Sequence, residues 1–338
     1  AWNVPFWVNV MVFIILIILY TLKGGIKTII WTDTLQTTFM LLALVLSVIF
    51  ISREMGVPLF KLAGQVTDSA VSKIFITDWT HPRFFLKQFF SGMFITIVMT
   101  GLDQEMMQKN MSCRNIRDAQ KNMFTFSGIN FFVVLLFLFL GAFLLIFSRS
   151  KGINVAFTDD LFPTVALNYL GPLAGIVFLI GLISAAFPSA DGALTSLTTS
   201  VTLDFLGLDK RKELTEAGRR RIRYGVHITI AVIFFICILI FKSMNDRAVI
   251  DKLFTIAGYT YGPLLGLYSF GLFTNRQVKD KVTPAIAIIS PVICYIIGVN
   301  SEEWFNGYKF GFEMLLVNGF LTFMGLLALS KPSPKSEI

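Results

Sequence analysis

Nine long apolar runs divide this sequence of 338 residues, and they constrain its fold more than any other feature. A bilayer core about 30 Å thick requires about 20 predominantly apolar residues per helix. Charged residues make up only 15% of the chain, against roughly 25% in an average soluble domain. We therefore predict an all-α, multi-pass membrane protein with nine transmembrane helices. The predicted spans are residues 6–22, 35–51, 84–102, 123–147, 172–203, 224–241, 253–273, 285–299 and 310–329.

Composition and motifs also exclude several classes of function. The net charge of +8 is carried by short loops between apolar runs, as in membrane proteins, so no nucleic-acid partner is expected. His81 and His227 are far apart in the sequence, which argues against a histidine metal cluster. The chain contains no GxSxG, HExxH or P-loop pattern and no arginine ladder within a span. We therefore expect neither an enzyme nor a voltage sensor.

The distribution of lysine and arginine predicts the orientation. Most of the 29 Lys and Arg residues lie in the C-terminal tail and in the loops after the first, third, fifth and seventh spans, with the largest share in residues 210–223. Such residues concentrate on the cytoplasmic side. We predict a protein of the cell (inner) membrane whose N-terminus in this chain is outside and whose C-terminus is cytoplasmic. Residues 1–330 would form a single transmembrane domain, and residues 331–338 a short cytoplasmic tail.

The fifth span contains a proline followed by polar residues. Pro188 removes a backbone donor, which leaves a carbonyl one turn earlier, near Ser184 and Ala185, without its helical partner. The hydroxyl of Ser189 and the carboxylate of Asp191 follow, and such hard oxygen atoms suit an alkali or alkaline-earth cation. The alternative is a proline-kinked packing helix whose Ser and Asp side chains bond to neighbouring helices.

Asp33 stands at the start of the second span. A carboxylate there is favourable against the helix dipole and needs no further role. The functional interpretation is that Asp33 meets the polar residues of the fifth span, because both lie toward the cytoplasmic half of the membrane.

Three further spans carry polar or conformationally irregular residues. Gly101, followed by Asp103 and Glu105, marks a kink or an unwound point where backbone dipoles can reach a ligand. An ordinary polar helix end at the membrane interface is the alternative. In the seventh span, two glycines and a proline around Tyr259 indicate a hinge, and the fourth span places Asn130 inside the membrane.

Three stretches of the sequence resemble the sodium:solute symporter family. Residues 21–36, TLKGGIKTIIWTDTLQ, are similar to its Gly-Gly…Trp-Thr-Asp…Gln signature. Residues 101–121 are similar to its Gly-x-(Asn/Asp)-Gln…Gln-Arg…Ala-Gln-Lys stretch. Residues 184–204 are similar to its sodium-site helix, and the resemblance extends over nearly the whole chain.

The resemblance implies a partial leucine-transporter-type inverted-repeat fold with discontinuous helices and central sites. The nine spans would correspond to core helices four to ten plus two peripheral helices. Core helices one to three would then be absent, as in an N-terminally truncated chain, and such a chain is not expected to transport alone.

The resemblance also implies where sodium binds. The carbonyl of Ala185 and the hydroxyl of Ser189 would hold the main sodium ion. The family often has a hydroxyl residue immediately before the second of these ligands, and here that residue is Pro188. One expected ligand is therefore missing.

Some members of the family bind a second sodium ion between an aspartate and hydroxyl groups further along the sodium-site helix. The matching positions here are Asp33, Asp191 and Gly192. The resemblance thus implies a possible second cation site at Asp33 and Asp191. The two carboxylates would compete for ionisation unless a cation lies between them, or would share a proton.

The solute pocket is also implied only by resemblance. Sugar-transporting members carry an aromatic platform where this chain has Met99, and a lysine where it has Asn130, so a hexose stacked as in those members is not expected. The candidate substrate-binding residues are Met99, Thr100, Gln104, Asn130 and Tyr259.

Together these features predict a sodium-coupled secondary symporter that imports a small polar organic solute across the cell membrane. Sodium is the expected ion, the lipid bilayer and a small-molecule solute are the expected partners, and the oligomeric state is not predicted. One alternative is a proton-coupled transporter of the same fold that uses Asp33 and Asp191. Another is the membrane input domain of a sensor protein.

Overall fold

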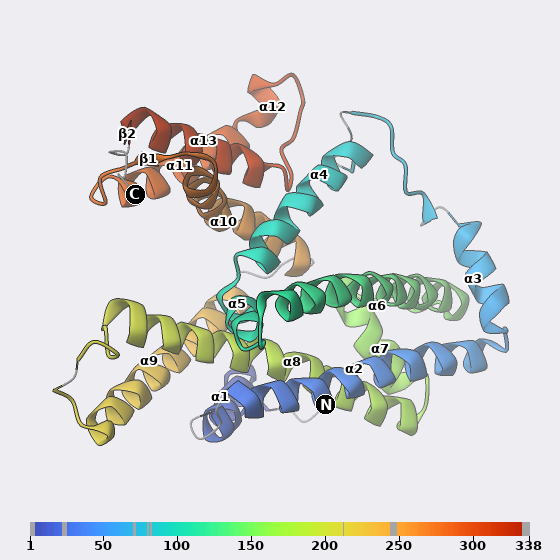
Figure 1. Cartoon of the computed structure of the whole chain (residues 1–338). Coiled ribbons are helices and arrows are strands. Elements are labelled where there is room, and N and C mark those ends of the chain that lie inside the picture. Colours follow the sequence, from blue (N-terminus) through green and yellow to red (C-terminus); the bar gives the residue numbers. More distant parts are fainter. Residues whose placement is uncertain are drawn as a thin grey trace. The chain divides into compact units, whose positions relative to one another are not determined.

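Helices dominate the structure (Figure 1). The computed structural model describes residues 4–21, 26–69, 72–79, 81, 83–211, 213–243 and 249–332, and the side chains of residues 26–29 and 249–252 lie outside this description. Within the described residues each of the nine predicted spans coincides with a helix, and the only strands are the two-residue pair β1 (Arg276–Gln277) and β2 (Lys331–Pro332). The predicted all-α class is therefore confirmed.

Contacts within the chain divide it into two compact units, which we describe separately. Unit 1 comprises Ala1–Ser72 and Gln104–Asp246, and unit 2 comprises Lys73–Asp103 and Arg247–Ile338. The prediction of one transmembrane domain followed by a short tail stays a prediction. Residues 331 and 332 of the predicted tail pair with β1, and residues 333–338 lie outside the described residues.

Unit 1 holds most of the long helices. Four described helices of this unit, α2, α6, α8 with η4, and α9, are long and apolar enough to cross a membrane. The shorter α1 is also apolar. The elements are α1 (Phe6–Thr21), α2 (Ile26–Met55), α3 (Leu59–Thr67), α5 (Gln104–Met111), α6 (Ile116–Lys151), the 3₁₀ turn η3 (Thr158–Asp160), α7 (Leu161–Asn168), α8 (Pro172–Ser200), the π-helical turn η4 (Val201–Phe205) and α9 (Glu216–Ser243).

The sequence specifies both ends of the longest helix, α6. Asn115 caps its N-terminus by accepting the backbone N–H of Asp118 at 2.9 Å. Gly152 ends the helix with φ of 65°, a left-handed conformation that glycine adopts without steric cost.

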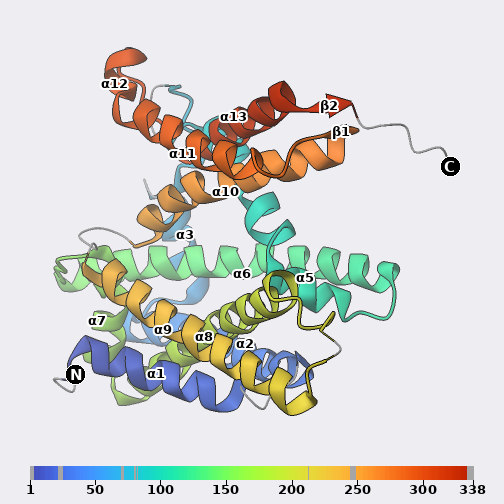
Figure 2. The same cartoon turned by 90° about the vertical axis from the view of Figure 1, so that its left-hand side faces the viewer.

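Close helix packing builds the core of unit 1. α8 packs along α2, and a Cβ at Gly181 would overlap the side chain of Ala43, so glycine permits the two backbones to approach. α1 and α9 pack against the same helix α8 and against each other (Figure 2). The polar residues on α1, α2 and α8 are thereby held in one bundle.

Unit 2 is built around α10 (Val249–Phe273), α11 (Thr283–Val299) and α13 (Met314–Leu329), which pack together (Figure 1). It also contains α4 (Phe85–Thr96), the π-helical turn η2 (Ile97–Gly101) and the short α12 (Ser301–Trp304). α11 and α13 are apolar but only 17 and 16 residues long. The helix formed by α4 and η2 is long and apolar enough to cross a membrane only when it is counted together with α5, which follows after a break at residues 102–103. The irregular backbone expected at Gly101 is therefore present as a π-helical turn.

Glycines at intervals of four residues bring α10 close to α13. A Cβ at Gly262 would overlap the side chain of Asn318, and one at Gly266 would overlap the carbonyl oxygen of Gly319. Small residues at such spacing are typical of tightly packed membrane helices. The segment around Tyr259, predicted as a hinge, is thus part of a packing interface.

A proline inside α10 reinforces this interface. Pro263 has no N–H, so the carbonyl of Tyr259 one turn earlier loses its helical donor. The side chain of Asn318, which is fully buried, donates to that carbonyl at 2.8 Å and receives a hydrogen bond from Ser290 at 2.6 Å. The broken hydrogen bond is therefore satisfied by a neighbouring helix, as is typical of prolines in membrane helices.

Candidate functional site

Polar side chains from four helices of unit 1 meet in a cluster that we call the acidic cluster: Asp33 of α2, Glu105 and Lys109 of α5, Asp191 of α8 and Tyr20 of α1. Glu105 and Lys109 stand four residues apart on α5, so one helix face presents both. The Lys109 ammonium lies 2.6 Å from Oε1 of Glu105 and 2.7 Å from Oδ2 of Asp33. All three side chains are mostly buried, with exposures of 15–27%.

Asp191 is the most deeply buried member of the acidic cluster. Its exposure is 0%, and its Oδ2 accepts a hydrogen bond of 2.5 Å from the Tyr20 hydroxyl. The carboxylates of Asp191 and Asp33 are close enough to interact electrostatically. The structure thus brings Asp33 to the polar part of α8, and each carboxylate has its own donor rather than a proton shared between them.

Gly192 makes room for Glu105. A Cβ at Gly192 would overlap the carboxylate of Glu105, so the adjacent glycine lets the acidic end of that side chain lie directly against α8. An oxygen-bearing side chain at this position would occupy the same space.

On α2, α5 and α8, which carry the carboxylates of the acidic cluster, four buried polar atoms have no hydrogen-bond partner within the described residues. A buried polar atom without a partner costs free energy, and such atoms in proteins are usually met by water or an ion. The atoms are Oδ1 of Asp33, Oε1 of Gln36, Oδ1 of Asp191 and Nε2 of Gln108. Three of them are oxygens able to face a cation. Across the same described residues, however, no three acidic, histidine or cysteine side chains converge in a geometry that could hold a metal ion.

The predicted ligands of the main sodium ion lie one turn apart on α8. Pro188 stands inside this helix, as expected, and the carbonyl that it leaves without a helical donor is that of the buried Ser184. Ala185 and Ser189 share a helix face that is exposed in unit 1. Their role as sodium ligands stays a prediction.

The predicted substrate residues are divided between the two units. Gln104 and Asn130 are exposed on α5 and α6 of unit 1. Met99 and Thr100 lie in η2 of unit 2, where Met99 packs on the apolar cluster around Leu315. The ring of Tyr259 contacts Tyr295 of α11, at 6.1 Å between centroids. The pocket that would join these five residues stays a prediction.

Sequence reasoning missed Tyr20 as a partner of Asp191 and assigned Lys109 only to the positive-inside pattern. A tyrosine near a membrane interface is usually an anchor, so its sequence position alone does not indicate an intramembrane hydrogen bond. Lys109 could have been suspected because it follows Glu105 by four residues and belongs to the family-like stretch of residues 101–121.

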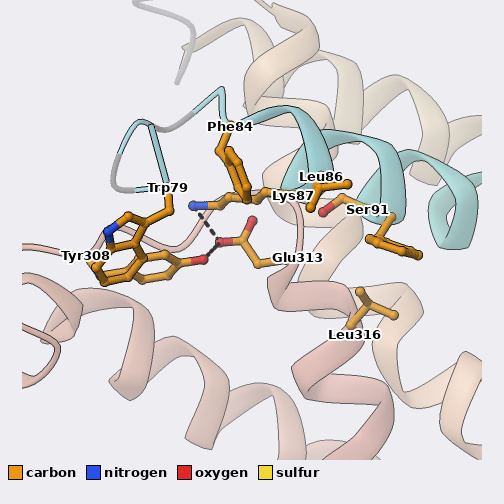
Figure 3. Close-up of a pocket in the computed structure, with 9 residues that line it drawn as sticks. Trp79, Phe84, Leu86, Lys87, Ser91, Tyr308, Glu313 and Leu316 are labelled. Carbon is orange, nitrogen blue, oxygen red and sulfur yellow. Dashed lines mark hydrogen bonds and ion pairs between the residues drawn. The ribbon is translucent and has the colours of Figure 1, made fainter. Parts of the chain in front are cut away.

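Unit 2 contains a pocket of about 260 Å³ between α4, α13 and the segment before α13 (Figure 3). At its centre the Lys87 ammonium lies 2.8 Å from Oε1 of Glu313 and 4.2 Å from the ring centre of Tyr308. The Tyr308 hydroxyl donates to the same carboxylate oxygen at 3.0 Å. Burial and the Glu313 carboxylate raise the pKa of Tyr308 above its ordinary value, so the hydroxyl keeps its proton. This buried ion pair joins α4 to α13.

Discontinuous helices and buried polar clusters inside an apolar bundle are features of secondary transporters. The family model of the sodium:solute symporter family (SSF) matches residues 1–280. The chain belongs to this family.

Several known proteins are similar to the chain. It is 21% identical to the sodium/sialic acid symporter NanT of Aliivibrio fischeri, over 91% of this chain and 62% of that protein. It is 23% identical to the sodium/sialic acid symporter SiaT of Proteus mirabilis, over 91% of this chain and 63% of that protein. The rabbit sodium-dependent multivitamin transporter is 26% identical, over 79% and 43% of the two chains. The chain therefore spans about three fifths of the length of the two sialic acid symporters.

A solved structure shows the same fold. The structure of a substrate-bound, outward-open Na⁺-coupled sialic acid symporter matches with a TM-score of 0.77 at 18% identity, over 98% of this chain and 69% of that chain. This agreement confirms the transporter fold expected from the resemblance. The relatives are transporters rather than enzymes.

Proposed function

We propose that the protein containing this chain is a sodium-coupled symporter that imports a small polar organic solute across the cell (inner) membrane. Family membership and the sodium-coupled relatives support this proposal. The N-terminus of this chain would be outside and its C-terminus cytoplasmic, as the distribution of Lys and Arg predicts.

The observation that carries the proposal is the arrangement of oxygen atoms along α8. Pro188 leaves the carbonyl of Ser184 without a helical donor, and the Ala185 carbonyl and the Ser189 hydroxyl stand next to this interruption. The buried carboxylate of Asp191 lies two residues after Ser189, on the helix that packs along α2. Carbonyl, hydroxyl and carboxylate oxygens are the donors that hard cations prefer. We infer that the Ala185 carbonyl and the Ser189 hydroxyl bind the main sodium ion from the exposed face of α8.

Coupling would be thermodynamic. Sodium bound to α8 would favour the state that also binds the solute, and the inward sodium gradient would then drive release inside the cell. This coupling needs no covalent chemistry and no organic cofactor.

Asp33 and Asp191 are proposed as a second cation site. Each has one oxygen atom paired and one buried oxygen without a partner in the described residues. Two interacting carboxylates in an apolar bundle are stabilised by a neighbouring positive charge.

The solute is proposed only by class. Relatives are named for sialic acid, vitamins, iodide, monocarboxylates and glucose, so their names agree on sodium coupling but not on the solute. Met99, Thr100, Gln104, Asn130 and Tyr259 remain the proposed substrate-binding residues.

Uptake measured with the complete gene product tests the proposal. A panel of labelled sugars, amino acids and carboxylates would be supplied with and without sodium at a fixed pH. We expect uptake of at least one solute to require sodium. Uptake that follows the proton gradient and ignores sodium would instead support the proton-coupled alternative.

Substitution at α8 locates the ion. Ser189→Ala should raise the sodium concentration for half-maximal uptake severalfold, because it removes one oxygen ligand. Ser196→Ala is a matched control on the same helix, since its hydroxyl donates to its own backbone at the Ala193 carbonyl. An unchanged sodium requirement in Ser189→Ala would remove this residue from the site.

A further inference from the structure

The acidic cluster already contains a cation. The Lys109 ammonium lies within 2.7 Å of carboxylate oxygens from two different helices, Asp33 of α2 and Glu105 of α5. An ammonium is a compact point charge, and its place between two carboxylates is the place that a free metal cation would take. We propose that Lys109 is the cation of the second site, so that Asp33 binds this tethered ammonium instead of a second sodium ion. This inference rests on the proposed symport function.

The ligands expected for a second sodium ion are missing or engaged. Gly192, at a position where the family resemblance implies a hydroxyl, has no side chain, and the Glu105 carboxylate fills the space beside it. Asp191, at the other such position, directs its Oδ2 to the Tyr20 hydroxyl. The described acidic side chains do not converge on a common point suited to a metal ion.

The missing side chain at Gly192 leaves the space that the Glu105 carboxylate occupies. Because Gly192 carries no Cβ, the Glu105 carboxylate can lie against α8 while it binds the Lys109 ammonium, which Asp33 also binds. A side chain at position 192 would displace Glu105, and the ammonium would lose one of its two carboxylates. The lack of a hydroxyl-bearing side chain at position 192 is therefore linked to the binding of Lys109, because it makes room for the Glu105 carboxylate that binds the ammonium.

Tethering gives the lysine an advantage over a free ion. The ammonium is held near Asp33 by its own helix, so its effective concentration at the carboxylate is high and independent of the sodium gradient. Removing it would leave Asp33, Glu105 and Asp191 as three carboxylates in a mostly buried cluster. Such a cluster attracts cations strongly.

The test counts sodium ions bound to the purified complete gene product, with radioactive sodium as the probe. Lys109→Gln is expected to bind one sodium ion more than the unaltered protein. Lys109→Arg, which keeps a cation, is expected to bind the same number as the unaltered protein. Lys151→Gln is the matched control, because Lys151 pairs with Glu54 at 3.3 Å with both side chains exposed. A folded Lys109→Gln protein with an unchanged sodium count overturns the inference.

A second variant keeps the inference testable if Lys109→Gln does not fold. Asp33→Asn leaves Lys109 paired with Glu105, and it should leave the number of bound sodium ions unchanged. Loss of one sodium ion in Asp33→Asn overturns the inference. Failure of the proposed symport function can be told apart from failure of this inference. It would appear as solute uptake that requires no sodium in the unaltered protein, irrespective of how many sodium ions the variants bind.

Discussion

His227 is a buried histidine whose two ring nitrogens both contact threonine hydroxyls. Nε2 lies 3.0 Å from the hydroxyl of Thr21 on α1, and Nδ1 lies 2.9 Å from that of Thr198 on α8. A neutral imidazole donates at one nitrogen and accepts at the other, so the ring is satisfied without a metal or a charge. This one residue of α9 therefore connects its own helix to α1 and α8.

We expect His227→Ala to lower the free energy of unfolding of unit 1 by about 2 kcal/mol or more, since two buried hydrogen bonds are lost and a cavity remains. Thermal unfolding in detergent would measure the change. His81→Ala is the control, because His81 is exposed and its ring accepts one local backbone N–H. Equal effects of the two substitutions would contradict a structural role for His227.

At the scale of the element, the pairing of α10 with α13 depends on the absence of side chains. Gly262→Ala should destabilise unit 2 by about 1–3 kcal/mol, because the added Cβ would overlap Asn318 in a tightly packed interface. Gly271→Ala on the same helix has open space around its Cβ and should be neutral or slightly stabilising. Thermal unfolding of both variants checks the difference, and similar behaviour would contradict the packing argument.

For the whole molecule, the distribution of Lys and Arg along the chain predicts an orientation in the membrane that labelling can test. Cysteines introduced at Thr158 and Asp209, both exposed, are expected to face opposite sides of the membrane. With the natural Cys113 changed to serine, a membrane-impermeant maleimide on intact cells should label Thr158→Cys and spare Asp209→Cys. The reverse pattern would invert the predicted topology.

The fold class and the presence of a helix at each predicted span could be predicted from the sequence alone, although α2, α6 and α9 begin well before the predicted limits. This succeeded because the length of an apolar run decides whether a helix can cross a bilayer, and that property is local. Motif spacing also indicated the polar positions Asp33, Ser189 and Asp191, and the structure places α2 along α8 as this requires. The interruption at Gly101 could be predicted for the same reason, since glycine and polar residues weaken an apolar helix locally.

Which polar groups meet depends on how the helices pack and could not be predicted from the sequence. Tyr20 and Asp191 are separated by 171 positions, and Lys109 and Asp33 by 76, so their contacts depend on how α1, α2, α5 and α8 pack. The same holds for Asn318, which donates to the carbonyl freed by Pro263 from a different helix. Local sequence specifies which side chains carry charge. Packing specifies which of those charges are neutralised inside the protein, because electrostatic and hydrogen-bond energies depend on distances of a few ångströms between distant parts of the chain.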